Sequence, residues 1–101
     1  MRRVVITGMG IYSCLGTNID AVRDSLYNGV SGIVFDPIRK EMGFRSALTA
    51  KLEVPELKGV LSRSQRVYMP EQAKYAYVAT AEALKNAGVD QDYLDSHEVG
   101  L

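Results

Sequence analysis

The sequence predicts an α/β chain that holds only part of a sheet. A run of β-branched residues at Val4–Ile6 is typical of a strand, apolar residues recur at helical spacing before Ala87, and the tail at 99–101 is apolar again. These features predict the order βαααβ, with the two end strands parallel and joined by a right-handed crossover. Two strands leave unpaired edges, so the sheet is expected to be incomplete.

The first strand is expected to be buried on both faces. Val4–Ile6 shows no alternation of apolar and polar residues and is followed by Gly8 and Gly10, a pattern typical of a central parallel strand. A helix is predicted next, from about Asn18 to Asn28. Its apolar side chains recur at helical spacing, and Gly29 favours a C-terminal stop.

Residues 30–61 form a long stretch without sustained periodicity. Glycine and proline recur every few residues, at Gly32, Pro37, Gly43, Pro55 and Gly59. Loops longer than roughly 12 to 15 residues are uncommon in compact domains unless they bind or contact something. We therefore expect a binding or interface excursion, with one short strand within Ser46–Leu52.

Two helices are predicted after this excursion. Ser62 and Gln65 fit a capping box that starts a short helix. Pro70 ends that helix and favours the first position of a new one, which runs to about Ala87 and closes on Gly88.

The second of these helices has an alanine-rich broad face. Its charged residues keep to the other side, at Glu71, Lys74, Glu82 and Lys85. Small side chains let backbones approach closely, so we expect the helix to be wedged between a sheet and a further layer. That layer is not evident in the chain. Val99 to Leu101 is predicted to begin a second buried strand.

Composition and charge exclude several classes of protein. The 101 residues are 47% hydrophobic and 24% charged, as in globular rather than disordered chains. Twelve basic and twelve acidic side chains balance, so no overall field would attract nucleic acid or an anionic membrane. Cys14 is the only cysteine, which excludes an internal disulfide and a structural zinc site. We predict no metal, no cofactor and no targeting or membrane segment, and a reducing cytoplasm fits.

The strongest local signal for a ligand is the predicted strand followed by Gly8-Met9-Gly10. In dinucleotide-binding folds, such a turn lets backbone amides approach a pyrophosphate. Two common patterns fail here, because the first needs a third glycine at Ser13 and the second needs glycines at Tyr12 and Cys14. The acidic residue that would hold a ribose after a second strand is also missing. A structural glycine turn is therefore the favoured interpretation.

No catalytic residue is predicted in the chain. Cys14 lies between Ser13 and Leu15 with no base nearby in sequence, so it is expected to be a small packed hydrophobic residue rather than a nucleophile. His97, in the polar tail, is expected to be a solvated loop residue rather than a general base.

Arg63 and Arg66 form the candidate binding pair. They lie three residues apart on the short capped helix, so they project from neighbouring positions and could grip an anionic group. On charge pattern alone, an ordinary solvated helix face is the favoured interpretation.

Several stretches of the chain form one ordered set. They are M-R-R-V-V-I-T-G-M-G-I-Y-S-C-L-G at 1–16, N-G-V-S-G-I at 28–33, G-F-R-S at 43–46, R-x-x-R-V-Y-M at 63–69, A-L-K-N-A-G at 83–88 and H-E-V-G-L at 97–101. In this order and spacing they resemble the start of the elongating β-ketoacyl-acyl-carrier-protein synthases of fatty acid synthesis. The resemblance covers essentially the whole chain, and it identifies residues 1–101 as an N-terminal fragment of that family's N-terminal domain, cut at the second strand.

This resemblance implies a thiolase-type fold of two similar α/β halves stacked in layers, in an enzyme that is a homodimer. The implied reaction is acyl transfer to an active-site cysteine, then decarboxylation of a malonyl thioester on the carrier protein and carbon–carbon bond formation. The family's Cys-His-His constellation lies beyond the region that corresponds to Leu101. Cys14 and His97 match none of its members, so the chain alone is expected to be inactive.

The resemblance also assigns a partner to the arginine pair. The family docks its acidic acyl carrier protein partly through basic residues on the helix preceding the R-x-x-R-V-Y-M region. Arg63 aligns with one such position and Arg66 lies close to another, although Ser64 stands where relatives can carry lysine. Docking of the carrier protein at Arg63 and Arg66 by electrostatic steering is therefore implied.

Two other functions stay open at this stage. One is a self-contained small α/β domain that binds a partner through residues 30–61, and the weaker one is a nucleotide-binding module at Gly8. If the synthase interpretation is right, unpaired strand edges and an uncovered helix face predict that the isolated chain aggregates or is partly unfolded.

Overall fold

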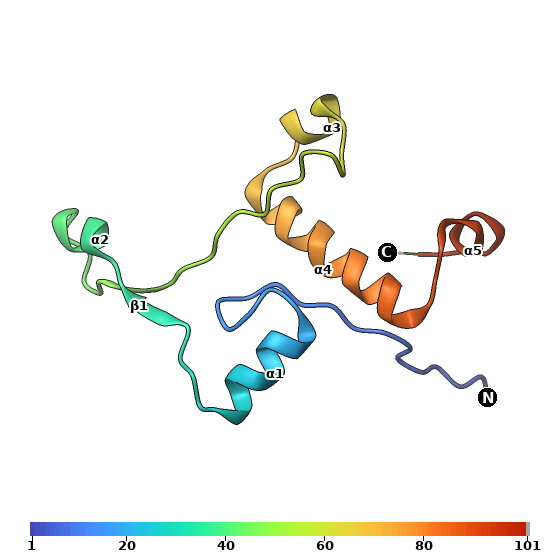
Figure 1. Cartoon of the computed structure of the whole chain (residues 1–101), viewed down its shortest axis with the longest axis horizontal. Coiled ribbons are helices and arrows are strands. Elements are labelled where there is room, and N and C mark those ends of the chain that lie inside the picture. Colours follow the sequence, from blue (N-terminus) through green and yellow to red (C-terminus); the bar gives the residue numbers. More distant parts are fainter. Residues whose placement is uncertain (101) are drawn as a thin grey trace.

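The structure is a computed structural model that describes residues 1–100. It contains five helices and one small sheet in that range (Figure 1). The element order is α1 (Ile19–Tyr27), β1 (Ile33–Phe35), α2 (Pro37–Glu41), β2 (Leu48–Ala50), α3 (Arg63–Val67), α4 (Glu71–Ala87) and α5 (Gln91–Ser96).

The chain is extended and has almost no core of its own. Its radius of gyration is 17.4 Å, whereas a folded domain of 100 residues has about 13 Å. It exposes 8637 Å², whereas a compact monomer of this mass exposes roughly 5,700 Å². Within residues 1–100 the buried hydrophobic side chains are Val22 and Leu57. Many large hydrophobic side chains are exposed, Val4, Leu26 and Tyr68 among them.

The predicted first strand is wrong for this structure. Residues 1–12 have no strand assignment, and Val4 and Ile6 are 95% and 84% exposed. In Figure 1 this segment is an extended tail that leads to the N-terminus. A strand requires backbone hydrogen bonds to a neighbouring strand, and no strand in residues 1–100 pairs with this segment. The apolar run is present without the sheet that would bury it.

Helix α1 confirms the predicted helix between Asn18 and Asn28. The Asn18 side chain accepts a hydrogen bond from the Ala21 backbone N–H at 2.8 Å, which satisfies one of the free N–H groups of the first turn. After Asn28, Gly29 adopts a positive φ of 64°, a conformation that glycine takes without a steric penalty.

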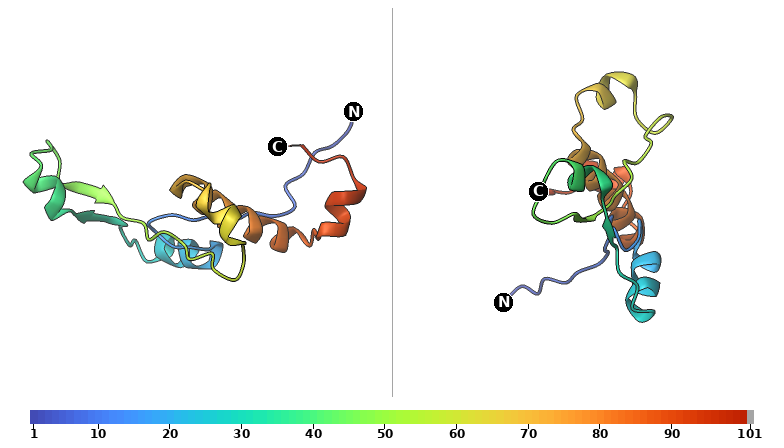
Figure 2. Two further views of the ribbon diagram at one scale, coloured as in Figure 1. Left: turned by 90° about the horizontal axis from the view of Figure 1, so that it is seen from above. Right: turned by 90° about the vertical axis from the view of Figure 1, so that its left-hand side faces the viewer.

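The predicted excursion folds into a projecting arm, which we define as residues 33–50. Strands β1 and β2 pair antiparallel, with Ile33 opposite Ala50 and Phe35 opposite Leu48, and α2 lies between them. Figure 2 shows the arm at the opposite end of the molecule from the two termini. The predicted strand within Ser46–Leu52 is confirmed as β2.

Strand β1 and helix α2 were not predicted. Helix α2 has only five residues, too few to show a helical period, although Asp36 caps it and Pro37 occupies its first turn. The predicted order βαααβ with parallel end strands is wrong, because the sheet in residues 1–100 is a two-stranded antiparallel ribbon.

Helices α3 and α4 begin and end close to the predicted residues. In the capping box, Ser62 Oγ accepts from the Gln65 N–H at 3.3 Å, and Gln65 Oε1 accepts from the Ser62 N–H at 3.0 Å. Pro70 is the N-cap of α4, one position before the predicted one. Gly88, with a φ of 72°, closes α4 as predicted.

The C-terminal part differs from the predicted strand. Helix α5, capped by the Asp90 side chain, follows α4, and residues 97–100 are not in a strand. The predicted second strand therefore has no counterpart at Val99 and Gly100, and Leu101 lies outside the described residues. None of the helices in residues 1–100 is long and apolar enough to span a membrane.

Candidate functional site

The glycine segment, residues 8–12, lies directly on helix α4. A Cβ atom added to Gly8 would lie 2.6 Å from the Ala87 backbone nitrogen, and one added to Gly10 would overlap the Ala79 carbonyl oxygen and lie 2.8 Å from the Ala83 nitrogen. The glycines therefore allow backbone to contact backbone, which agrees with the close approach expected at the alanine-rich face. Helix α4 fills the space that a pyrophosphate would need.

Side chains of α4 bind the backbone of this segment. Glu82 Oε1 accepts from the Ile11 N–H at 2.9 Å, and Glu82 Oε2 accepts from the Ile19 N–H at 3.0 Å. One turn further along α4, Asn86 Oδ1 accepts from the Met9 N–H at 3.2 Å. Sequence analysis missed this role of Glu82, because the periodicity of α4 assigns Glu82 to the solvated side.

A pair of stacked tyrosines joins the same segment to the excursion. The Tyr12 ring stacks on the Tyr75 ring with centroids 5.3 Å apart, and the Tyr12 hydroxyl donates to the Glu53 carbonyl at 2.6 Å. Partial burial, together with the nearby Glu71 carboxylate and Tyr12, raises the pKa of Tyr75 above its ordinary value.

Cys14 lies in a tight turn and packs against the base of the arm. Ser13 and Gly16 exchange backbone hydrogen bonds of 2.9 and 3.2 Å around it. The thiol is half-buried, and a Cβ atom added to Gly32 would lie 2.6 Å from Cys14 Sγ. Cys14 thus occupies the packed position expected of a small hydrophobic residue.

His97 closes helix α5. Its ring stacks on Tyr93 at 4.0 Å between centroids, and Nδ1 lies 3.0 Å from the Tyr93 carbonyl oxygen and 2.9 Å from Ser96 Oγ. The side chain is exposed at the helix end, and within residues 1–100 its hydrogen bonds involve Tyr93 and Ser96 rather than Cys14. Within residues 1–100 there is also no group of three or more side chains able to hold a metal.

Arg63 and Arg66 lie on α3, as expected. Arg63 is the first residue of the helix and is exposed, whereas Arg66 is half-buried and donates from Nε to the Leu61 carbonyl at 3.2 Å. No ion pair joins either guanidinium to a carboxylate of the described chain. The two arginines thus differ: Arg66 anchors the preceding loop, and Arg63 is open to solvent.

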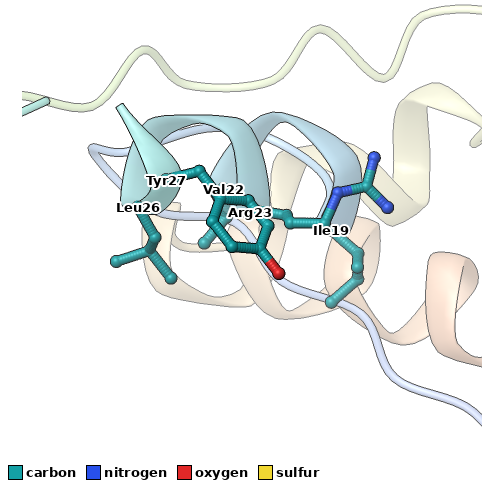
Figure 3. Close-up of a pocket in the computed structure, with 5 residues that line it drawn as sticks. All are labelled: Ile19, Val22, Arg23, Leu26 and Tyr27. Atoms are coloured by element: carbon teal, nitrogen blue, oxygen red, sulfur yellow. The ribbon is translucent and has the colours of Figure 1, made fainter. Parts of the chain in front are cut away.

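A shallow apolar pocket lies on α1, and neither Arg63 nor Arg66 lines it. Its volume is about 430 Å³, and its lining side chains come from one helix (Figure 3): Ile19, Val22, Arg23, Leu26 and Tyr27. Leu26 and Tyr27 are largely exposed. Val22 is one of the two buried hydrophobic residues of the described range, so this face of α1 is covered at Val22 and open to solvent at Leu26 and Tyr27.

These features belong to a known class of protein domain. Over residues 1–101 the chain matches the beta-ketoacyl synthase N-terminal domain, and it belongs to this family. It is 41% identical, over its whole length, to 3-oxoacyl-acyl-carrier-protein synthase 1 of Buchnera aphidicola subsp. Acyrthosiphon pisum and of Haemophilus influenzae. It is 34% identical to the synthase of the same name from Escherichia coli strain K12. The chain spans 25% of the length of each of these relatives.

The comparisons confirm the family that the ordered motifs indicated. Part of the predicted fold class also agrees, because the chain is a β-ketoacyl synthase N-terminal domain with helices and a small sheet. The layered thiolase-type arrangement needs more sheet than residues 1–100 contain.

Proposed function

We propose that the chain is part of a 3-oxoacyl-acyl-carrier-protein synthase, a condensing enzyme of fatty acid biosynthesis. The observation that carries this proposal is the ordered match along the whole chain to relatives of that name, at 34 to 41% identity. The reaction is transfer of an acyl group to an active-site cysteine, followed by decarboxylative condensation with a malonyl thioester on the carrier protein.

In this proposal the chain supplies scaffold and a docking surface rather than reacting groups. Cys14 is packed against Gly32, and His97 closes a helix, so neither has the setting of an activated nucleophile or its base. The extended shape and the exposed apolar residues support a thiolase-type layered fold in which further sheet and a second subunit cover this surface. The cysteine and histidines of the reaction then lie in another part of the enzyme.

Carrier-protein docking is proposed for Arg63 and Arg66. Arg63 is exposed at the start of α3, and the Arg66 Nε contact holds the preceding loop against the same helix. An acidic carrier protein would be attracted to this pair by charge, which mainly raises the rate of encounter. Arg63 is then the direct contact, and Arg66 contributes both charge and the shape of the loop.

Charge reversal tests the docking proposal in the complete gene product. The variant Arg63→Glu is expected to raise the KM for the acyl carrier protein roughly tenfold, equivalent to about 1.4 kcal/mol, with little change in kcat. The increase should shrink at high salt, because exposed charges are screened. Steady-state kinetics with purified carrier protein at two salt concentrations provide the measurement.

Two matched variants accompany this measurement. Lys85→Glu reverses an exposed charge on α4, outside the proposed surface, and is expected to leave the KM for the carrier unchanged. Arg66→Lys keeps the charge but loses the Nε donor to Leu61, and separates loop anchoring from charge. If Arg63→Glu and Lys85→Glu give the same KM as the parent enzyme, the docking proposal is wrong.

The two alternative functions have less support. A self-contained interaction domain would need its own core, whereas the chain buries only Val22 and Leu57 in the described range. A nucleotide-binding module would need space beside Gly8 and Gly10, and atoms of α4 fill that space.

A further inference from the structure

One carboxylate joins three parts of the chain that are distant in sequence. Glu82 lies on α4, Ile11 lies in the glycine segment, and Ile19 is the first residue of α1. The two Glu82 oxygens each accept one backbone N–H, at 2.9 Å from Ile11 and 3.0 Å from Ile19, and both contacts are partly buried. A single side chain therefore fixes both ends of the turn that connects them.

We propose that Glu82 is a positioning residue that holds the turn between residues 11 and 19 on α4. An ionised carboxylate only accepts hydrogen bonds, so both of its oxygens suit N–H donors. Hydrogen bonds to a charged acceptor are stronger than neutral ones. The N-terminus of α1 also carries unsatisfied N–H groups and a partial positive charge, which favours a carboxylate there.

In the glycine segment, side chains of α4 accept backbone N–H groups that a neighbouring strand would accept in a sheet. The N–H groups of Met9 and Ile11, two residues apart, both point to α4 and are accepted by Asn86 and Glu82. In an extended chain, alternate N–H groups face the same side. Gly10, between them, brings the backbone within reach of these side chains. Without Asn86 and Glu82, these donors would lose their protein partners.

The turn that Glu82 holds also reaches the base of the arm. The Leu15 carbonyl accepts from Ser25 Oγ of α1 at 2.6 Å, and Cys14 packs on Gly32, next to β1. Displacing the turn would therefore disturb the packing of α1 and the start of the arm. This inference concerns the positioning of α1 and the arm, and it does not depend on the proposed condensing activity.

Hydrogen–deuterium exchange tests the role of Glu82 in the complete gene product, read residue by residue by fragmentation mass spectrometry. In Glu82→Gln, the isosteric amide keeps one acceptor oxygen and places an NH₂ group against the other donor. We expect one of the two amides, Ile11 or Ile19, to exchange at least about tenfold faster, while the other stays protected. In Glu82→Ala both amides should exchange faster by that factor.

Three controls distinguish the loss of these two hydrogen bonds from destabilisation of the whole protein. The Tyr93 amide, whose hydrogen bond the Asp90 side chain accepts at the start of α5, should exchange at the parent rate in both variants. In Asn86→Ala, the Met9 amide should exchange faster, while the Ile11 and Ile19 amides keep their exchange rates. Glu71→Gln, which neutralises another carboxylate of the same helix, should leave Ile11 and Ile19 at their original rates.

The isosteric variant decides the result. If the Ile11 and Ile19 amides of Glu82→Gln both exchange at the rates of the parent protein, the carboxylate does not hold the turn. Glu82 would then contribute only the packing of its aliphatic carbons. Because Glu82→Gln preserves shape and volume, this comparison remains available even if Glu82→Ala does not fold.

Discussion

Heating the 101-residue chain alone is expected to produce no cooperative unfolding transition. Ordering each residue costs roughly 1 to 2 kcal/mol of backbone entropy, which burial of apolar surface must offset. Within the described range only Val22 and Leu57 are buried hydrophobic residues, and the chain exposes 8637 Å². The two free edges of the β1–β2 ribbon and the uncovered apolar residues of the arm further favour association between chains.

The measurement combines scanning calorimetry with sedimentation of the purified chain. We expect no sharp heat-absorption peak and a broad distribution of aggregates, whereas the complete gene product should unfold cooperatively under the same conditions. A single sharp transition from a monomeric 101-residue chain would mean that it folds without further covering surface, and would favour the self-contained domain.

Replacement of Gly10 by alanine is expected to lower the free energy of unfolding of the complete gene product by about 3 kcal/mol or more. The new methyl group would overlap the Ala79 carbonyl oxygen and crowd the Ala83 nitrogen. Both atoms belong to the backbone of the longest helix, so neither can rotate away as a flexible side chain would. The glycine segment would have to lift off α4, which would also lengthen the contacts from Met9 and Ile11.

Denaturant unfolding of the parent and of Gly10→Ala measures this effect. Equal stabilities for the two proteins would contradict the close packing of the segment on α4.

Features that depend on a few neighbouring residues could be predicted from the sequence. The Ser62–Gln65 capping box and the Gly88 stop each act within one turn of helix, so their residue types are sufficient to locate them. For the same reason the boundaries of α1, α3 and α4 were predicted closely.

Features that depend on distant partners could not be predicted. The apolar run at Val4–Ile6 has the composition of a buried strand, but a strand forms only beside another one, and residues 1–100 supply none there. Helix α2 is too short to have a detectable period. Glu82 follows the polar side of α4 in sequence, and only the folded chain brings the Ile11 and Ile19 amides to it.

In the candidate site, too, local features could be predicted and contacts with more distant residues could not. Arg63 and Arg66 both lie on α3, the short helix that the capping box predicted. The Arg66 contact with Leu61 was not predicted, because it depends on how the preceding loop folds back. The family itself was predictable, since it rests on the order of motifs along the whole chain.

The most direct test of the account is a condensation assay with acyl and malonyl carrier proteins, in which mass spectrometry detects the 3-oxoacyl product. The gene is expressed both as residues 1–101 and in full. We expect product from the complete protein and none from the 101-residue chain. Product formed by the 101-residue chain alone, or none formed by a folded complete protein, would contradict the proposed function.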